Sequence, residues 1–307
     1  MGRLAIKIDV DTYRGTRDGA LPLCDMLERA GAPALFLFSM GPDNTGKALR
    51  RIFRRGFVKK CLRSNVAGNY GLKTLMYGTL LPAPDIGRRC AEQMRETSRR
   101  GFSCGIHSWN HFKWQDYLFD MDFDDVLGEF SKAAAAFCDV FGFSPASCGA
   151  PGWQCSPVSL EVQDGFGLKF CSDVRGSRPF MPVMDGRKFS TLQIPSTLPT
   201  LDELLGTLTL PEISARYFSE IEKDGNHVLT IHSELEGMAY AEYFSGFLEE
   251  AKRRGVEFFS LDAWADELLK NPGSIPEAEI QMRPFPGRSG LLAVQLPAPE
   301  ESAEESD

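Results

Sequence analysis

The sequence predicts an α/β fold, a barrel of parallel strands that alternate with helices, and three observations support this prediction. Short apolar runs alternate with helical patterns along most of the 307 residues, as expected for repeated β-then-α units and a parallel sheet. Apolar residues make up 43% of the chain, enough for a sizeable core. Most polar residues with catalytic chemistry come directly after a predicted strand, as at the rim of a barrel, whereas an open sheet would gather them at one switch point.

The predicted strands are short apolar runs bounded by glycine, proline or polar residues. In chain order they cover residues 4–10, 34–39, 102–107, a stretch near 147, 169–172, 191–194, 226–231 and 256–259. The predicted helices have apolar residues three and four positions apart, and Gly31 and Gly101 close the first two. They cover residues 21–30, 85–100, 122–141, 211–223 and 240–254.

Two segments interrupt this alternation. An insertion at about 40–84 follows the second strand, and a loop at 175–188 is rich in proline, glycine and arginine. Long insertions at a barrel rim usually serve the substrate. Because the alternation ends after Pro272, we expect a barrel over residues 1–272 and an extended C-terminal segment over 273–307. The acidic end of that segment is predicted to be disordered.

The first insertion is basic, while the rest of the chain is acidic. Between Asp43 and Lys73 nine basic residues and one acid give a net charge of +8; the whole chain carries −8, which leaves −16 for the remainder. Apolar and basic residues fall on opposite helical faces there, which predicts an amphipathic helix on an anionic membrane surface. The basic residues of this predicted membrane-interfacial surface are Lys47, Arg50, Arg51, Arg54, Arg55, Lys59, Lys60 and Arg63. A helix docked on the barrel is the alternative, and nucleic acid is not expected, because no nucleic-acid-binding motif is present.

Cysteine usage and hydropathy bear on the compartment. The eight cysteines form no C-x2-C pair, and several lie in apolar runs, as small buried thiols do. With no signal peptide, this usage indicates a reducing cytoplasm. No apolar stretch approaches the ~20 residues that span a bilayer. We therefore expect a cytoplasmic protein, peripheral on the cytoplasmic face of the inner membrane.

Two of the four histidines, His107 and His111, lie four positions apart after an apolar run. This spacing directs both imidazoles to one side of a helical turn, where they can hold one metal ion. Asp9 and Asp11 end the first strand and point to the same face, and two carboxylates this close repel unless a cation lies beside them. One of them would complete a facial site with open positions. The alternatives are a pair of surface histidines and two acids that cap the strand end.

The motifs I-D-V-D, H-S-W-N-H, A-P-G-W and L-T-I-H occur in this order, and the chain resembles the polysaccharide deacetylase family, the NodB-homology carbohydrate esterases. The longer stretches I-D-V-D-T-Y-R-G-T-R, F-S-M-G-P-D-N, T-I-H-S-E-L-E-G and P-G-R-S-G-L-L-A are similar to one branch of it, the 4-deoxy-4-formamido-L-arabinose-phosphoundecaprenol deformylases. The resemblance extends from about residue 3 to about residue 295. It implies an irregular (β/α) barrel of the NodB-homology type with the basic helical insertion at its rim.

The resemblance also implies roles for individual residues. A divalent metal, for which Zn, Mn, Co and Fe all suit the donor set, would be held by Asp11, His107 and His111. Asp9 would be the catalytic base and His232, after the strand at 226–231, the acid; the alternative for His232 is a core histidine. The residues expected at the oxyanion or the substrate are Trp153, Asp173 and Arg175.

One position departs from the family pattern. The wider family has an arginine two residues before the proline of the A-P-G-W loop, where it steadies the base, and this chain has Gly149. The contact must come from elsewhere or be absent. Arg175 is a candidate for it, and it could equally bind the substrate phosphate, because arginine suits oxyanions.

The expected function is a metal-dependent amide hydrolase. By resemblance it would hydrolyse the formamide of undecaprenyl-phosphate-linked 4-deoxy-4-formamido-L-arabinose to the free amine and formate. This step resembles part of the aminoarabinose modification of lipid A, which lowers surface charge and blunts cationic peptides. Two alternatives remain: an N-deacetylase of a soluble sugar or peptidoglycan precursor, and a catalytically silent barrel that binds anionic lipid.

Overall fold

The computed structural model describes residues 2–48, 71 and 73–296, and its central element is the strand β1 (Arg3–Val10). One edge of β1 pairs with β2 (Ala34–Ser39) from Ile6 onward, and the other edge pairs with β9 (Asn226–His232) from Arg3 to Asp9. The short strand β10 (Glu257–Phe258) pairs with the start of β1. Beyond β2 the sheet continues, all parallel, through β3 (Ser103–Ser108), β4 (Ser147–Cys148), β5 (Phe170–Cys171) and β8 (Leu192–Gln193).

The curled sheet closes through a few contacts after β8 rather than through a full ladder. The backbone N–H groups of Thr197 and Leu198 both donate to the Val228 carbonyl of β9 over 3.1 Å. The Ser196 and Thr230 hydroxyls lie 2.7 Å apart across the same junction. This irregular closure confirms the predicted barrel.

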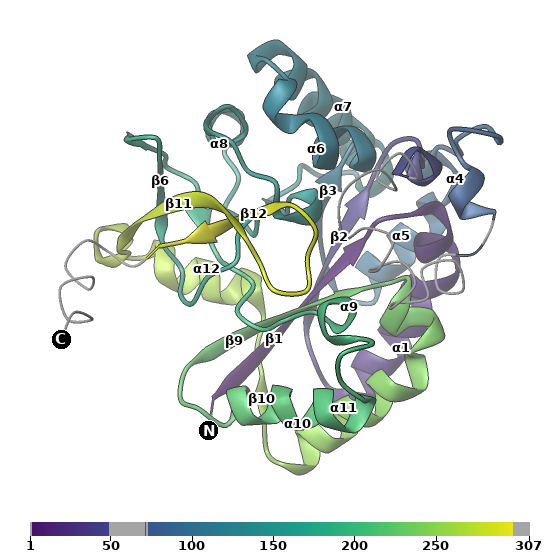
Figure 1. Cartoon of the computed structure of the whole chain (residues 1–307), viewed down its shortest axis with the longest axis vertical. Coiled ribbons are helices and arrows are strands. Elements are labelled where there is room, and N and C mark those ends of the chain that lie inside the picture. The colour runs from purple at the N-terminus through teal and green to yellow at the C-terminus, as the bar shows by residue number, and fades with distance from the viewer. Residues whose placement is uncertain (1, 49–70, 72, 297–307) are drawn as a thin grey trace.

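Helices cover the outer face of the sheet, as Figure 1 shows with α1, α10 and α11 on one side and α6 and α7 on the other. The helices are α1 (Ala20–Ala30), α4 (Ile86–Arg89), α5 (Ala91–Arg99), α6 (His111–Tyr117), α7 (Phe123–Phe141), α8 (Pro157–Phe166), α9 (Leu201–Leu204), α10 (Leu210–Ile221), α11 (Ala241–Arg253) and α12 (Leu261–Leu269). Short π-helical turns occur at Gly15–Gly19 and Leu235–Ala239, and 3-10 turns at Thr74–Met76, Leu118–Asp120, Pro151–Trp153 and Pro272–Ser274.

Most predicted helices are confirmed, with two corrections. The segment 85–100 forms two helices instead of one, because Cys90 has a non-helical backbone (φ −115°, ψ 18°) between α4 and α5. The sequence interpretation also missed the short helices α6 and α9 and the helices α8 and α12. α8 begins at a capping box of Ser156 and Ser159 with Pro157 between them, and this was the available signal.

The two faces of β1 have different surroundings. Its even-numbered residues, Leu4 to Val10, pack with apolar side chains of the covering helices such as Leu23 and Leu27. Ala5, on the opposite face, packs inside the barrel with Leu37. Because strand side chains alternate, Lys7 and Asp9 share the inner face with Ala5.

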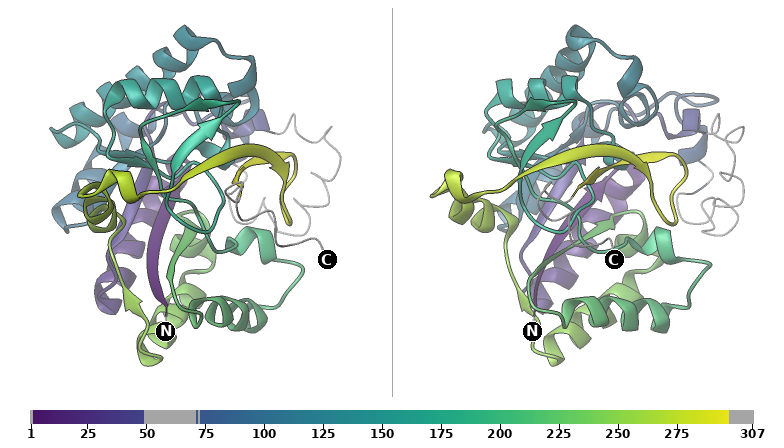
Figure 2. Two further views of the ribbon diagram at one scale, coloured as in Figure 1. Left: turned by 90° about the vertical axis from the view of Figure 1, so that its left-hand side faces the viewer. Right: turned by 60° about the vertical axis from the view of Figure 1, so that its left-hand side comes forward.

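A second, small sheet lies beside the barrel. The hairpin of β11 (Glu277–Pro284) and β12 (Leu291–Gln295), yellow in Figure 2, pairs through β11 with β6 (Met181–Met184), which pairs with β7 (Arg187–Lys188). The sequence interpretation gave a loop to 175–188 and no strands to the segment after 272, so these strands correct it. Prolines and glycines interrupt the alternation that would have revealed them. The division of the chain at residue 272 remains a prediction.

The ends of the basic insertion meet at the barrel rim. The Asp43 N–H donates to the Pro84 carbonyl over 2.9 Å, and the Gly46 N–H donates to the Tyr77 carbonyl over 2.9 Å. Lys47 is described, but the other predicted membrane-interfacial residues, Arg50, Arg51, Arg54, Arg55, Lys59, Lys60 and Arg63, lie outside the described residues, as does the acidic tail. Within the described part of the chain, no helix is both long enough and apolar enough to span a membrane.

Candidate metal centre

Asp9 and Asp11 reach the site because β1 is held on both edges up to its end. The Asp9 carbonyl accepts a hydrogen bond from the Ser233 N–H over 3.1 Å. After Val10 the chain leaves the sheet, and the Thr12 N–H and hydroxyl both donate to the Glu234 carboxylate, over 2.8 and 2.7 Å. These bonds fix the chain on both sides of Asp11, which follows β1 directly.

His107 and His111 come from two different elements. The sequence interpretation placed both on one helical turn, but His107 belongs to β3 and His111 is the first residue of α6. The Asn110 side chain caps this helix by accepting from the Lys113 N–H over 3.1 Å, which starts the helix directly after the strand. The imidazoles still face one another, with ring centroids 5.2 Å apart.

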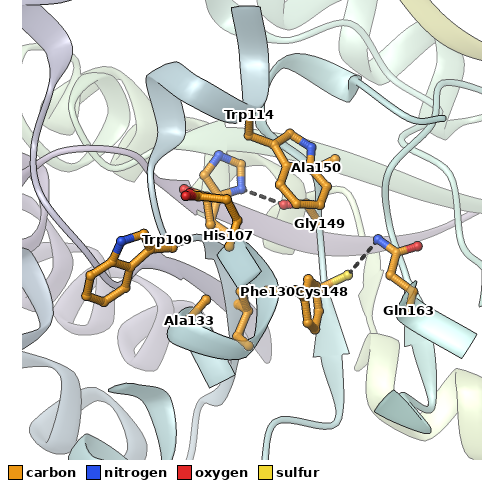
Figure 3. A pocket seen from close by; sticks show the side chains of 12 residues that line it. His107, Trp109, Trp114, Phe130, Ala133, Cys148, Gly149, Ala150 and Gln163 are labelled. Atoms are coloured by element: carbon orange, nitrogen blue, oxygen red, sulfur yellow. Dashed lines mark hydrogen bonds between the residues drawn. The ribbon is translucent and has the colours of Figure 1, made fainter. Parts of the chain in front are cut away.

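The three predicted ligands converge on one point. The Asp11 Oδ1 atom lies 3.1 Å from Nε2 of His107 and 3.5 Å from Nε2 of His111. The three ligand atoms lie within 4.8 Å of one another. His107 Nδ1 lies 2.7 Å from the Gly149 carbonyl (Figure 3), so it carries the hydrogen and leaves the Nε2 lone pair directed at the site.

The electrostatics of the centre favour a cation. Burial by itself would raise the pKa of Asp11, but His111 and His107 hold it well below its usual value. For His107 the effect of burial has the opposite sign: burial alone would lower its pKa, but the negative charges of Asp9 and Asp11 raise it. Burial, and then the charge of Asp11, raises the pKa of the neighbouring Glu234 well above its usual value.

These residues fit a divalent metal ion. Asp11 Oδ1 is buried and has no hydrogen-bond partner, which is costly unless a cation lies beside it. Two imidazole nitrogens and one carboxylate oxygen suit Zn, Mn, Co or Fe and leave coordination positions open. The arrangement can therefore hold a metal whose remaining positions accept water and a carbonyl oxygen.

A second cluster of possible ligands, Cys148, Cys171 and Asp173, is less suited to a metal. Burial raises the pKa of each thiol, which disfavours the thiolate that a metal requires. The Asp173 carboxylate already accepts hydrogen bonds from the Ala150 N–H (2.7 Å) and from the side-chain amides of Gln163 (2.9 Å) and Gln193 (3.1 Å). It thereby fixes the loop whose Gly149 carbonyl orients His107.

Asp9 and His232 lie next to one another at this edge of the sheet. They are register partners in the parallel pair of β1 and β9. His232 Nδ1 lies 3.9 Å from Asp202 Oδ1, and Arg288 of the β11–β12 turn contacts the same carboxylate at 3.2 Å. Sequence reasoning missed both residues: Asp202 belongs to no family-like motif, and Arg288, although it lies in P-G-R-S-G-L-L-A, had no predicted role.

Trp153 and Arg175 are more deeply buried than the sequence suggested. Trp153 has a left-handed backbone (φ 52°), its N–H donates to the Ala150 carbonyl over 3.2 Å, and its ring stacks below the Arg175 guanidinium at 5.0 Å. Arg175 is only 3% exposed and contacts Glu203 and the Leu198 carbonyl. An oxyanion role for Trp153 and a phosphate role for Arg175 remain predictions.

The cation that contacts the base candidate belongs to a different residue. The fully buried Lys7 has its ammonium group 3.5 Å from Asp9 Oδ1. The sequence predicts Arg175 as a candidate for this contact, but Arg175 pairs with Glu203 and Lys7 lies at Asp9. The i, i+2 spacing of Lys7 and Asp9 on one strand was the available signal.

His107 also lines a small cavity together with Trp109, Cys148 and Gly149 (Figure 3). Trp114, Glu129 and Gln163 belong to its lining as well. The volume open to the centre of a water molecule is about 10 Å³, which is roughly what one buried water needs. Glu129 Oε2 and Gln163 Oε1 are buried without a hydrogen-bond partner. The cavity is therefore a site for an internal water and not an opening for substrate.

Comparison with known proteins places this site in context. No family model matches the chain. A protein of Shewanella sediminis named "Probable 4-deoxy-4-formamido-L-arabinose-phosphoundecaprenol deformylase ArnD" is 36% identical, over 95% of this chain and 94% of that protein. A protein of the same name from Wigglesworthia glossinidia brevipalpis is 31% identical, over 92% of this chain and 98% of its own. A solved structure described as a polysaccharide deacetylase from Mycobacterium smegmatis covers 92% of this chain and 94% of its own, with a TM-score of 0.63 and 16% identity, and this likeness shows the fold.

We predict that His107→Ala and His111→Ala each lose bound metal, because each removes one of three ligands. The affinity for Zn²⁺ should fall by more than about a hundredfold, since the loss of an outer-shell partner alone costs roughly 10- to 100-fold. Metal content after dialysis and calorimetric titration with Zn²⁺ measure the effect. The matched control is His227→Ala, which removes a half-buried histidine of β9 whose ring contacts only the Lys223 carbonyl at 3.2 Å among the bonds described. Full metal content in both site variants would show that the site is wrong.

Proposed function

The chain belongs to the family of 4-deoxy-4-formamido-L-arabinose-phosphoundecaprenol deformylases, and on this basis we propose that it removes the formyl group from an undecaprenyl-phosphate-linked 4-deoxy-4-formamido-L-arabinose. The products would be the free amine and formate, in the aminoarabinose modification of lipid A. The observation that carries the proposal is that two sets of residues lie together at one edge of the sheet. The register pair Asp9 and His232 adjoins the convergent ligands Asp11, His107 and His111.

The proposed reaction is the hydrolysis of an amide. A divalent metal bound by Asp11, His107 and His111 would lower the pKa of a water molecule and polarise the formyl carbonyl. Asp9 accepts a proton from the water molecule while the oxygen of that water adds to the formyl carbon. The carbon–nitrogen bond then breaks, and formate leaves.

His232 donates the proton that the departing amine nitrogen needs. Asp202 is the carboxylate that faces its Nδ1 atom, at 3.9 Å, and we assign proton donation to the other ring nitrogen, Nε2. The backbone N–H of His232 donates to Glu236 over 3.0 Å, and burial raises the pKa of Glu236 to about 8. These contacts hold the imidazole at the strand end beside Asp9.

The lipid-linked substrate accounts for the basic insertion at the rim. We propose that the insertion lies on the anionic cytoplasmic face of the inner membrane and brings the barrel opening to a substrate whose chain stays in the bilayer. The described ends of the insertion start beside the site, since Asp43 accepts a hydrogen bond from the Tyr13 N–H over 2.9 Å. Arg175 remains our candidate for the substrate phosphate.

Two other functions are separated from this one by direct assay. A soluble-sugar N-deacetylase would release acetate from an acetamido substrate without needing the lipid, and a silent barrel would release nothing. The test is metal analysis joined to product analysis on formamido and acetamido lipid-linked sugars. Formate release from the formamido substrate by the metal-loaded protein is expected; acetate release alone, or no release by a metal-loaded protein, would refute the proposal.

We predict that Asp9→Asn keeps the metal and loses turnover, because asparagine preserves the shape but cannot accept the proton. The value of kcat should fall by roughly 10²- to 10⁴-fold, the usual contribution of a general base. Steady-state kinetics with metal content measured on the same sample provide the test. Glu234→Gln is the comparison variant, since Glu234 is the next candidate for the base. A near-normal kcat in Asp9→Asn would move the role away from Asp9.

We predict that charge removal in the insertion weakens membrane binding without disturbing the metal. The four substitutions are Arg50→Gln, Arg51→Gln, Arg54→Gln and Arg55→Gln. Each basic group near an anionic surface contributes about 1 kcal/mol, so partitioning to anionic liposomes should fall about a hundredfold or more. High salt should mimic the effect on the parent protein by screening. Turnover of a chain-shortened soluble substrate should change little.

A matched control removes four exposed charges elsewhere on the surface: Arg187→Gln, Lys252→Gln, Arg253→Gln and Lys270→Gln. This variant should bind liposomes like the parent apart from the small change expected from net charge. Equal binding by the parent and the insertion variant would refute the membrane contact and favour a helix docked on the barrel.

A further inference from the structure

We propose that Lys7 is the positioning residue of the catalytic base: its ammonium group, reaching across the barrel interior from β1, holds the Asp9 carboxylate in place for proton transfer. The inference rests on the proposed function, in which Asp9 is the base. It adds a residue outside the metal ligands and explains how this chain works with Gly149.

Lys7 occupies an unusual environment for a lysine. Its side chain is 0% exposed on the inner face of the barrel, whose other residues include Ala5 and Leu37. Burying an ammonium group is expensive unless it is paired and hydrogen-bonded, and lysine is almost never fully buried without a partner. An apolar side chain would fill this interior at lower cost, so packing alone does not account for the lysine.

The partners of the ammonium group direct it to the base. It donates to the Ser172 carbonyl over 3.1 Å and lies 5.4 Å from the centre of the Trp153 ring. Its only carboxylate partner among the described ion pairs is Asp9 Oδ1, at 3.5 Å, and this oxygen has no hydrogen-bond partner. One carboxylate oxygen is thus turned toward Lys7, which leaves the other to accept the proton.

The absence of a side chain at Gly149 leaves room for the ammonium group of Lys7. A Cβ atom at Gly149 would lie 3.4 Å from Lys7 Nζ and 2.5 Å from a methyl group of Leu37. A longer side chain at position 149, directly after β4, would therefore enter the space that the ammonium group fills. The cation that acts on Asp9 comes from β1, two residues before the base, and position 149 is left empty for it.

The first test is Lys7→Met, which keeps the length of the side chain and removes its charge. We expect kcat on the formamido substrate to fall about ten- to a hundredfold, as for a misplaced reacting group, with KM and metal content unchanged. In the Asp9→Asn background the same substitution should cause no further loss, because its target is gone. The matched control is Lys169→Met, which removes a surface lysine paired with Asp266 at 2.8 Å and should leave kcat unchanged.

The second test relocates the cation. Lys7→Ala should lose turnover, and Lys7→Ala combined with Gly149→Arg should recover part of it, because the arginine enters the emptied space from β4. Gly149→Arg alone should lower the midpoint of thermal unfolding, since Lys7 still occupies that space. Recovery by a charge supplied from a different strand is a result that a purely structural role would not give.

The outcomes separate this inference from the proposed function. An active parent with a Lys7→Met variant of equal kcat, or an equal loss from Lys7→Met in the Asp9→Asn background, would overturn the role of Lys7 alone. A relocated arginine that restores stability without restoring kcat would also overturn it. A metal-loaded parent that releases no formate would overturn the proposed function and the inference together.

Discussion

The accumulation of buried carboxylates at the end of β1 is the constraint on which the rest of the site depends. Asp9 and Glu234 are buried, and the Asp11 side chain between them in the sequence is only 12% exposed and acts on Glu234 through its charge. Such a group of acids is stable only if positive charge is placed among them. The chain meets this demand in two ways. Lys7 supplies a fixed charge to Asp9, and the open triangle of Asp11 with two imidazoles leaves room for a metal ion.

The scaffold serves this arrangement by fixing strand ends. β1 pairs along both edges, so Asp9 and its register partner His232 are held by backbone hydrogen bonds. Behind them a chain of contacts extends from Asp173 to the Ala150 N–H, and the adjacent Gly149 carbonyl orients His107. The β11–β12 hairpin adds Arg288, which forms an ion pair with Asp202, the carboxylate that faces His232.

The sequence predicted the barrel and the approach of His107 to His111 because both depend on local patterns, whereas the choice of Asp11 as the third ligand came from the family resemblance and stays a prediction. Apolar runs marked the strands, and the H-x3-H spacing brought His107 and His111 together even though they lie on a strand and a helix rather than on one turn. Asp202 and Arg288 could not be found in this way, because tertiary contacts bring them to His232 from distant loops. Lys7 was within reach, since its spacing from Asp9 puts both on one face. The closeness of its ammonium group to Gly149 inside the barrel, which bears on the role of Lys7, is visible only in the three-dimensional structure.

The most direct test of this account is the position of the metal in crystals grown with Zn²⁺ or Mn²⁺, located by anomalous scattering. The account predicts a peak bonded to Asp11 Oδ1 and to Nε2 of His107 and His111, at about 2.0–2.2 Å for Zn²⁺, with open positions on the side of Asp9. A peak at Cys148, Cys171 and Asp173, or no peak at the histidines in a protein that turns over substrate, would contradict it.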